Sequence, residues 1–292
     1  MSKGYSAIVL GIGAMGSAAL YHLAKRGKKC LGLERFDIPH NRGSSHGVTR
    51  IIRLSYFEHP SYVPLLRRAF ELWGELESRS ATKLLHITGS IDAGRAGSNV
   101  FEGSRCSCEI HGLPHEILTS AQLTIRFPGY RLPSNFMALL QSEGGFLVPE
   151  ACVSAHVMQA QELGAEIHAR EKVLRWEPKH DSVEVTTEAG RYTAERLILS
   201  AGPWISEFVP ALKEKAVPER QVVGWFQPAK PELFRPEIFP VFNLQVDEGH
   251  YYGFPVFGIS GFKIGLYHHR NEQVNPDQVD RECHAEDEQV LR

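Results

Sequence analysis

The chain has 292 residues, which is enough for one large domain or two ordinary ones. Its 42% hydrophobic residues, 23% charged residues and net charge of -2 are typical of a soluble globular protein, and they argue against a basic nucleic-acid-binding surface and against long disorder. The sequence contains no run of about 18 apolar residues, so it predicts no membrane-spanning helix.

The cysteines indicate a reducing compartment. They are odd in number, at positions 30, 106, 108, 152 and 283, and no pair has the Cys-x-x-Cys spacing of zinc or redox sites. The apolar N-terminal stretch is interrupted by glycines, with no cleavage site after it. We therefore expect a cytoplasmic protein with reduced thiols, with no metal site and no membrane or nucleic-acid partner.

The first elements form a dinucleotide-binding unit. Residues 6–10 are predicted as a buried strand and residues 17–26 as a helix, with Gly11-Ile12-Gly13-Ala14-Met15-Gly16 between them. A second strand over residues 30–33 ends at Glu34, 18 positions after Gly16. This order and spacing match the dinucleotide fingerprint, whereas the glycine pattern alone would be weak evidence.

Each feature of that fingerprint has a physical role. Gly11 permits the tight turn, Gly13 lets the backbone approach a pyrophosphate, and Gly16 lets the helix lie close to the strands. The helix N-terminus faces the phosphates. Glu34 is predicted to accept hydrogen bonds from the adenosine ribose and to repel a 2'-phosphate, which disfavours NADP. The fingerprint leaves NAD and FAD open, because both present the same ADP half.

A polar, glycine-rich and basic loop follows over residues 39–53. Within it, Arg50 and Arg53 lie three positions apart, a spacing that places both guanidinium groups on one face of a helical turn. Two fixed cations there suit an anionic ligand. The alternative is a pair of solvated surface arginines.

Further elements are predicted in chain order. Residues 60–78 have the pattern of an amphipathic helix with an early proline, and residues 150–164 that of a helix ending at a glycine. Short strands are predicted over residues 84–92, 115–118, 136–147, 166–169, 182–187 and 196–200. The last strand, ending in Ser200-Ala201-Gly202, is expected to be buried, parallel and close to a bound cofactor.

These elements predict an α/β protein, α+β overall, with a discontinuous architecture. Residues 1–83 and 145–215 are assigned to a Rossmann-like cofactor domain. Residues 84–144 and 216–292 are assigned to a second, mostly antiparallel substrate domain.

Several motifs in this order resemble the flavin-dependent amine oxidases of the monomeric sarcosine oxidase and N-methyltryptophan oxidase family. The resemblance spans nearly the whole chain, and several ordered motifs are more specific than one fingerprint. The motifs are GIGAMG at 11–16, GSSHGVTRIIR at 43–53, LSAGPW at 199–204, RQVVG at 220–224 and YYGFP at 251–255.

The resemblance implies FAD as cofactor and oxidation of the C–N bond of a small N-methyl or secondary amino acid. The product is an imine that water hydrolyses, and dioxygen is reduced to hydrogen peroxide. The implied partners are an amine substrate and dioxygen. A monomer is expected, although the sequence leaves the oligomeric state open. The residues expected at the cofactor are Gly11, Gly13, Ala14, Met15, Gly16, Glu34, Arg35, Ser44, His46, Thr49, Arg50 and Gly202.

The same resemblance assigns the catalytic residues. Arg53 matches the arginine that binds the substrate carboxylate, and Arg50 the arginine against the flavin ring. Lys263 matches the lysine that assists oxygen reduction. Tyr252 and His268 match residues on the substrate side of the flavin, with Tyr252 also binding substrate. Leu266 looks like an insertion, so His269 competes with His268, and His46 is a weaker candidate.

The chain departs from the family at its C-terminal end, since family members continue beyond residues 287–292. None of the five cysteines matches the context of the family's covalent flavin linkage, so FAD is expected to bind noncovalently. One wall of the active site is expected to be absent, which predicts a chain that is unstable or inactive unless the remainder is supplied.

Two other functions stay open. One is a D-amino-acid oxidase or related flavin dehydrogenase, distinguished by its substrate and by its electron acceptor. The other is a catalytically silent FAD-binding remnant, which would retain FAD without producing peroxide.

Overall fold

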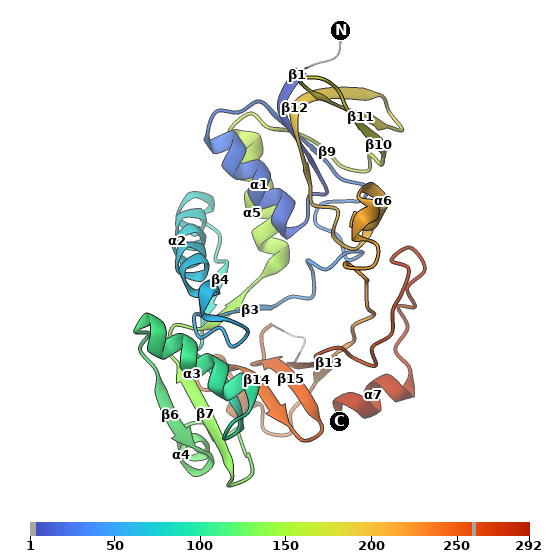
Figure 1. Ribbon diagram of the computed structural model, residues 1–292. Helices are drawn as coiled ribbons and strands as arrows, with labels where there is room; N and C mark the ends of the chain where they lie inside the picture. Colours follow the sequence, from blue (N-terminus) through green and yellow to red (C-terminus); the bar gives the residue numbers. More distant parts are fainter. Residues whose placement is uncertain (1–3, 259–260) are drawn as a thin grey trace.

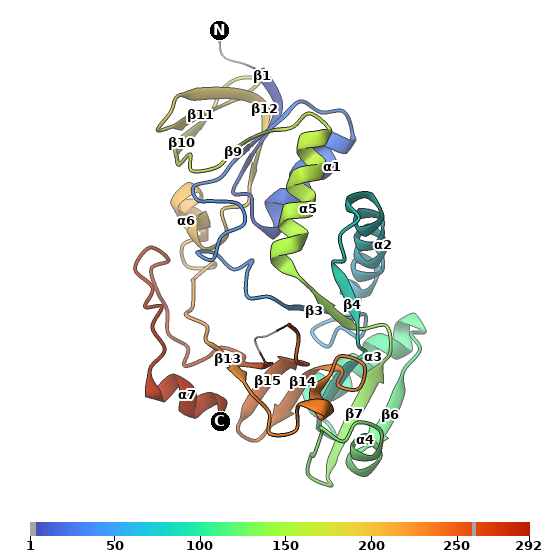
Figure 2. The same ribbon diagram turned by 180° about the vertical axis from the view of Figure 1, so that it is seen from behind.

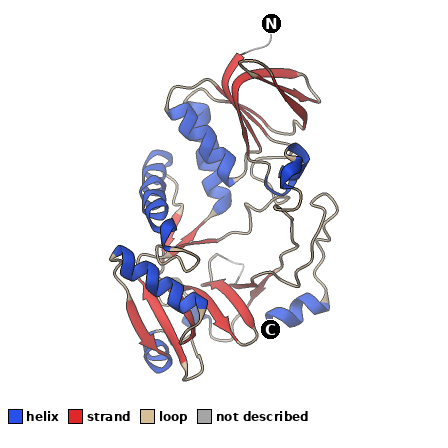
Figure 3. Ribbon diagram, viewed as in Figure 1, coloured by secondary structure: helices blue, strands red, loops and turns tan. Residues whose placement is uncertain are grey.

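The computed structural model describes residues 4–258 and 261–292. Three β-sheets with helices packed against them make up this part of the chain (Figure 1). The strands run both parallel and antiparallel, which confirms the predicted mixed α/β class. Figure 3 shows the largest two sheets at opposite ends of the molecule, with long helices and the smallest sheet between them.

The first sheet has six strands and contains the dinucleotide unit. β1 lies between β2 and β12 and pairs in parallel with both, whereas β10, β11 and β12 are antiparallel. Segments far apart in the sequence therefore complete one sheet. In spatial order the strands are β10 (Val173–Pro178), β11 (Val183–Thr187), β12 (Arg191–Leu199), β1 (Gly4–Leu10), β2 (Cys30–Leu33) and β9 (Glu166–His168).

Two helices, α1 (Ala14–Lys25) and α5 (Pro149–Glu162), pack side by side against this sheet (Figures 1 and 2). α5 begins with a proline in its first turn and is followed by Gly164 at φ +88°, the left-handed conformation that favours glycine. The buried side chains between these elements include Val9, Leu20 and Cys152. α2 (Val63–Ser80) packs beyond α5, preceded by a 3-10 turn, η1 (Pro60–Tyr62).

The second sheet has seven strands and is antiparallel except where β14 pairs with β5. α3 (Asn99–His111) and α4 (Ser120–Arg126) pack against it. Its core includes Ile91, Leu140 and Phe242. In spatial order the strands are β13 (Val223–Phe226), β16 (Phe262–Leu266), β15 (Gly249–Phe254), β14 (Val241–Val246), β5 (Ser90–Arg95), β7 (Phe136–Gln141) and β6 (Glu116–Thr119).

A small three-stranded sheet lies between the other two, and it overturns one prediction. It consists of β3 (Arg50–Ile52), β8 (Gly145–Leu147) and β4 (Leu85–Ile87). The helical turn expected over residues 49–53 was therefore wrong, because that segment pairs with β8 as a strand. Side chains alternate along a strand, so Arg50 and Arg53 point in different directions.

Other elements differ in detail from the sequence predictions. α1 begins at Ala14, directly after the glycine turn, and β10 was not predicted at all. The strand expected over residues 196–200 is parallel to β1 as predicted, but its last residues are only half-buried. The remaining short helices are η2 (Gly202–Trp204), α6 (Ile205–Phe208), η3 (Pro210–Leu212), η4 (Pro231–Phe234) and α7 (Ala285–Leu291).

Candidate active site

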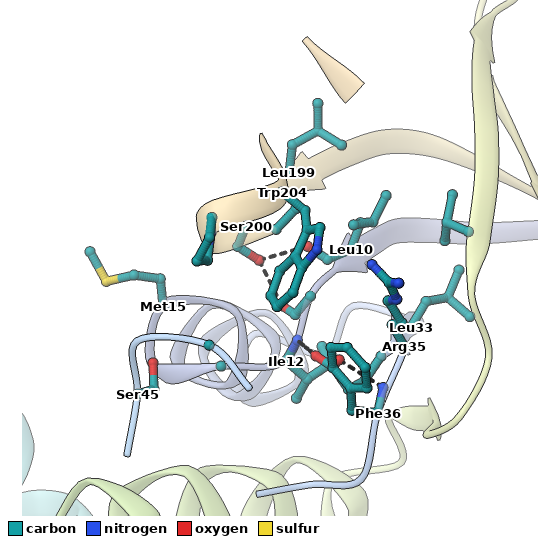
Figure 4. Close-up of a pocket in the computed structure, with 18 of the residues that line it drawn as sticks. Leu10, Ile12, Met15, Leu33, Arg35, Phe36, Ser45, Leu199, Ser200 and Trp204 are labelled. Atoms are coloured by element: carbon teal, nitrogen blue, oxygen red, sulfur yellow. Dashed lines mark hydrogen bonds between the residues drawn. The ribbon is translucent and has the colours of Figure 1, made fainter. Parts of the chain in front are cut away.

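A cavity of about 660 Å³ opens where the parallel strands of the first sheet end (Figure 4). This is the edge of an open α/β sheet at which ligands bind. Ile198 and Leu199 line it, which explains why the end of β12 is only half-buried. The lining includes most of the predicted cofactor residues, namely Gly11, Gly13, Ala14, Met15, Glu34, Arg35, Ser44 and Gly202.

The glycine turn is packed too closely for side chains. Gly11 has φ +88°, and a Cβ atom there would lie 2.5 Å from the Ser200 carbonyl oxygen. A Cβ atom at Gly16 would lie 1.8 Å from the Gly11 carbonyl oxygen. The turn therefore brings β1, β12 and the start of α1 together and exposes backbone along the cavity.

The Glu34 carboxylate is held in place at the end of β2. It is 5% exposed, its Oε2 accepts a hydrogen bond from the Ile12 amide at 2.8 Å, and its Oε1 accepts one from the Phe36 amide at 3.0 Å. A fixed acceptor beside the glycine turn fits the ribose hydroxyls of a dinucleotide, and the uncrowded backbone fits its pyrophosphate. The cavity therefore offers a fixed carboxylate acceptor and side-chain-free backbone, the two features that an ADP moiety needs.

The loop over residues 43–49 forms another wall of this region. Ser45, which sequence reasoning did not select, accepts a hydrogen bond from the Ala14 amide at 3.1 Å. Arg50 donates hydrogen bonds to the carbonyl oxygens of Ser44 at 2.7 Å and His46 at 3.0 Å, so it braces the loop. Burial lowers the pKa of His46 below its ordinary value, which favours the neutral imidazole.

Lys263 is buried beneath the same loop. It is 3% exposed, and its Nζ donates hydrogen bonds to the Gly47 carbonyl at 2.6 Å and to the Thr49 carbonyl at 3.1 Å. The ring of Phe254 lies 4.7 Å from Nζ. Burial, with a smaller contribution from Arg50, lowers the pKa of Lys263 to about 7. This ammonium can therefore change charge near neutral pH.

Glu150 holds the loop from the other side, a role that the sequence did not reveal. It lies in the first turn of α5, and its Oε1 accepts hydrogen bonds from the Gly47 amide at 2.6 Å and the Val48 amide at 3.2 Å. Val48 has φ +71°, which is unusual for a β-branched residue and marks a conformation imposed by these contacts. Glu150 and Lys263 thus fix the two faces of one peptide segment.

Arg53 lies apart from this loop in a second buried polar group. Its side chain is 6% exposed and pairs with Glu58 at 3.0 Å. Its guanidinium carbon lies 4.7 Å from the Tyr56 ring and 4.9 Å from the Phe57 ring. Stacking on two rings orients the planar guanidinium group for binding a carboxylate.

A buried carboxylate lies on the other side of Arg53. Asp92 is fully buried, and its Oδ1 lies 3.7 Å from Arg53 Nε. Asp92 also accepts hydrogen bonds from Ser55 at 2.9 Å, Ser104 at 2.8 Å and Asn243 at 2.8 Å. Four segments of the chain contribute to this network, so no local pattern could have predicted it.

The predicted tyrosine and histidine occupy different environments. Burial raises the pKa of Tyr252, which packs edge-on against Tyr267 at 5.3 Å between ring centroids. The His268 side chain is 70% exposed and pairs with Glu219 at 2.9 Å. His269 is buried and contacts Asp287 at 2.9 Å. The structure therefore brings neither histidine into the buried groups around Lys263 and Arg53.

Tyr267 occupies the sheet face on which a histidine was expected. It follows Lys263 and Gly265 at alternate positions, which is the strand periodicity that could have identified it. Its ring stacks on His250 with centroids 4.0 Å apart, and its hydroxyl donates to Asn243 Oδ1 at 3.4 Å. Burial raises the pKa of Tyr267 to about 12 and lowers that of His250 to about 4.

No group of three or more potential metal-binding side chains occurs among residues 4–258 and 261–292. Within the same ranges, no helix is long and apolar enough to cross a membrane.

Comparison with known proteins gives consistent matches. The family model described as FAD dependent oxidoreductase matches residues 6–291. The monomeric sarcosine oxidase of Streptomyces avermitilis is 40% identical over 296 residues, covering all of this chain and 77% of that protein. The N-methyl-L-tryptophan oxidase of Yersinia pestis is 34% identical over 265 residues, covering 90% of this chain and 70% of that protein.

Solved structures support the same fold. The open form of NikD, an amino acid oxidase of nikkomycin biosynthesis, has a TM-score of 0.79 at 23% identity and covers 99% of this chain and 76% of that one. An L-proline dehydrogenase from P. horikoshii has a TM-score of 0.79 at 19% identity, covering all of this chain and 76% of that one. These likenesses concern the fold alone.

Proposed function

Because the chain belongs to the FAD-dependent oxidoreductase family, together with monomeric sarcosine oxidases and N-methyltryptophan oxidases, we propose that it oxidises the C–N bond of a small N-methyl or secondary amino acid. The product is an imine, which water hydrolyses. FAD, when bound, supplies the acceptor for the hydride equivalent and delivers the electrons to dioxygen. The chain itself binds and orients the substrate and supplies the electrostatic environment of the reaction.

The observation that carries this proposal is the buried position of Lys263 beneath the loop that also borders the cofactor cavity. Ser44 and Ser45 of that loop line the cavity, and its Gly47 carbonyl accepts a hydrogen bond from Lys263. A fixed cation in a water-poor site stabilises negative charge that develops on dioxygen during its reduction. The pKa of about 7 leaves a substantial cationic fraction at neutral pH.

Arg53 is proposed to bind the substrate carboxylate. Its guanidinium group is already oriented by Tyr56 and Phe57, so little conformational freedom is lost on binding. Glu58, whose side chain is 37% exposed, is the partner that a substrate carboxylate would compete with. Tyr252 and Tyr267 lie on one face of neighbouring strands and are proposed to border the substrate.

Peroxide formation by the purified, FAD-loaded chain tests the proposal. Where the FAD-loaded protein turns over, we expect peroxide with N-methylglycine and other N-methyl amino acids, and none with their primary-amine counterparts. Turnover of D-amino acids but not N-methyl amino acids would favour a D-amino-acid oxidase instead. Turnover with an artificial electron acceptor but not dioxygen would identify a dehydrogenase, and FAD retention without any turnover would identify a silent binding protein.

We also infer a cytoplasmic monomer. All five cysteines are free thiols, three of them buried, as a reducing compartment allows. The name of the Streptomyces relative describes that protein as monomeric. Light scattering of the FAD-loaded protein should give a mass near 32.7 kDa, and a mass of about twice that would contradict the inference.

A further inference from the structure

An irregular segment links the second sheet back to the cofactor cavity. Residues 271–284, here called the clasp, connect β16 to α7 and contact η2 before returning to the second sheet (Figure 2). The clasp has no role in the chemistry proposed above. Two of its side chains, Asp277 and Arg281, nevertheless contact residues that line or flank the cavity.

The first contact joins the clasp to the cavity wall. The Asp277 Oδ1 atom accepts a hydrogen bond from Trp204 Nε1 at 2.9 Å and lies 3.0 Å from an Arg35 guanidinium nitrogen. Arg35 in turn packs against the rings of Phe36 at 5.0 Å and Trp204 at 5.4 Å. Arg35, Phe36 and Trp204 all line the cavity (Figure 4). Glu34, which directly precedes Arg35 in the chain, lines it as well.

A second contact lies on the adjacent loop. Arg281 donates hydrogen bonds to the carbonyl oxygens of Asn41 and Arg42, each at 3.0 Å. The next residues along the chain, Gly43 and Ser44, line the cavity. The clasp is thus fastened on two separate parts of the cavity rim.

The base of the clasp is fixed independently of the rim. The Arg220 side chain is 5% exposed and donates hydrogen bonds to the carbonyl oxygens of Asp280 at 2.8 Å and Glu282 at 2.6 Å. It also forms a two-pronged ion pair with Asp287, at 2.9 and 2.8 Å. This buried arginine keeps the clasp folded toward the cavity and does not itself touch the rim.

We propose that the clasp retains FAD, by holding the Glu34 end of the cavity closed through Asp277 and Arg281. By the dinucleotide fingerprint this is the adenosine end. FAD leaving at that end requires Arg35, Trp204 and the 41–42 loop to move apart. Each clasp contact opposes that movement, so the contacts slow cofactor release without taking part in substrate oxidation.

The experiment measures the rate at which FAD leaves the diluted holoprotein, followed by the rise in free-flavin fluorescence. We expect Asp277→Ala to release FAD about fivefold faster than the unaltered chain, as loss of one partly exposed ion pair and one hydrogen bond implies. Combining it with Arg281→Met should accelerate release by roughly tenfold or more. Asp277→Asn, which keeps an acceptor for Trp204 but removes the charge, should fall between.

Asp280→Ala is the matched control. Asp280 lies in the same clasp, but among the described residues its side chain accepts hydrogen bonds from the Glu282 amide and from His284, neither of which lines the cavity. We expect its release rate to match that of the unaltered chain. Two outcomes would overturn the proposal. One is the same FAD release rate for Asp277→Ala and Asp280→Ala. The other is faster release from Asp277→Ala together with a lower melting temperature of its FAD-free form, which would indicate general destabilisation. The readout needs no substrate, so it is independent of the proposed oxidation.

Discussion

The Lys263 ammonium nitrogen lies 2.6 Å from the carbonyl oxygen of Gly47, 216 positions earlier in the chain. This contact joins the second sheet to the loop that borders the cofactor cavity. It also removes the ammonium group from water, which is the largest cause of its lowered pKa. The buried position of the Lys263 ammonium group therefore both connects the second sheet to the loop and lowers the pKa of Lys263.

Replacing Lys263 should impair the reaction with dioxygen selectively. We expect Lys263→Met to lower the rate constant for reaction of the reduced protein with dioxygen by about 100-fold or more, because a preorganised charge is lost. Anaerobic reduction by substrate should change much less. Stopped-flow absorbance separates the two steps, with the exposed Lys213→Met as control. Equal losses in both steps would show that Lys263 acts through general structure.

The same group should determine a pH dependence. A pKa of about 7 means that Lys263 is cationic below neutral pH and loses its charge as pH rises through that value. The rate constant with dioxygen should therefore fall between about pH 6 and about pH 9, following one ionisation. Lys263→Met should give a flat profile over that range. A profile in Lys263→Met identical in shape to that of the unaltered chain would contradict the assignment.

Arg53 should be needed for carboxylate substrates in particular. Arg53→Met is expected to raise KM for N-methylglycine roughly 30-fold or more, because a charge-assisted pair is lost from a buried site. N-methylglycinamide lacks the carboxylate, so its weaker turnover should be nearly unaffected. Steady-state peroxide assays with both compounds measure the ratio. Parallel losses with both would mean that Arg53 does not bind the carboxylate.

The glycine turn should be intolerant of a single methyl group. Gly16→Ala should abolish FAD binding or lower the melting temperature strongly, since its Cβ would overlap the Gly11 carbonyl oxygen. Gly74→Ala is a matched control within a helix, because a Cβ there meets no atom within 4 Å. Gly74→Ala should stabilise the protein by about 0.5 to 1 kcal/mol. The FAD content and the melting temperature of both variants test this prediction.

FAD should be released by acid. None of the five cysteines is among the residues that line the cavity, and three of them are buried elsewhere in the core. We therefore expect the yellow colour to stay in the supernatant after acid precipitation. A yellow precipitate would show a covalent bond and require another point of attachment.

The sequence predicted the arrangement of residues where their contacts are local. The turn from Gly11 to Gly16 and the acidic residue at position 34 lie within one short stretch of the chain, and their spacing already implies their arrangement. It failed where contacts are distant. Residues 50–52 form a strand because they pair with residues 145–147, and nothing within residues 49–53 could show this.

The supporting residues of the site were missed for the same reason. Glu150 binds a loop about 100 positions earlier, and Asp92 collects donors from three other segments. Acidic residues in those contexts look like ordinary helix-start or strand residues. Only Tyr267 had a usable local signal, the alternation of Lys263, Gly265 and Tyr267 along one strand face.

The position of β1 between β2 and β12 affects how the protein can form on the ribosome. β1 ends at Leu10, whereas the parallel partner on its other side ends at Leu199. One edge of β1 must therefore wait, with its backbone groups unpaired, until the chain has been made as far as β12. Unpaired edges of this kind attract other strands. We therefore expect the yield of native protein to depend on the translation rate and on chaperones that bind the nascent chain. Substitutions in the outer strands of the second sheet should change that yield less.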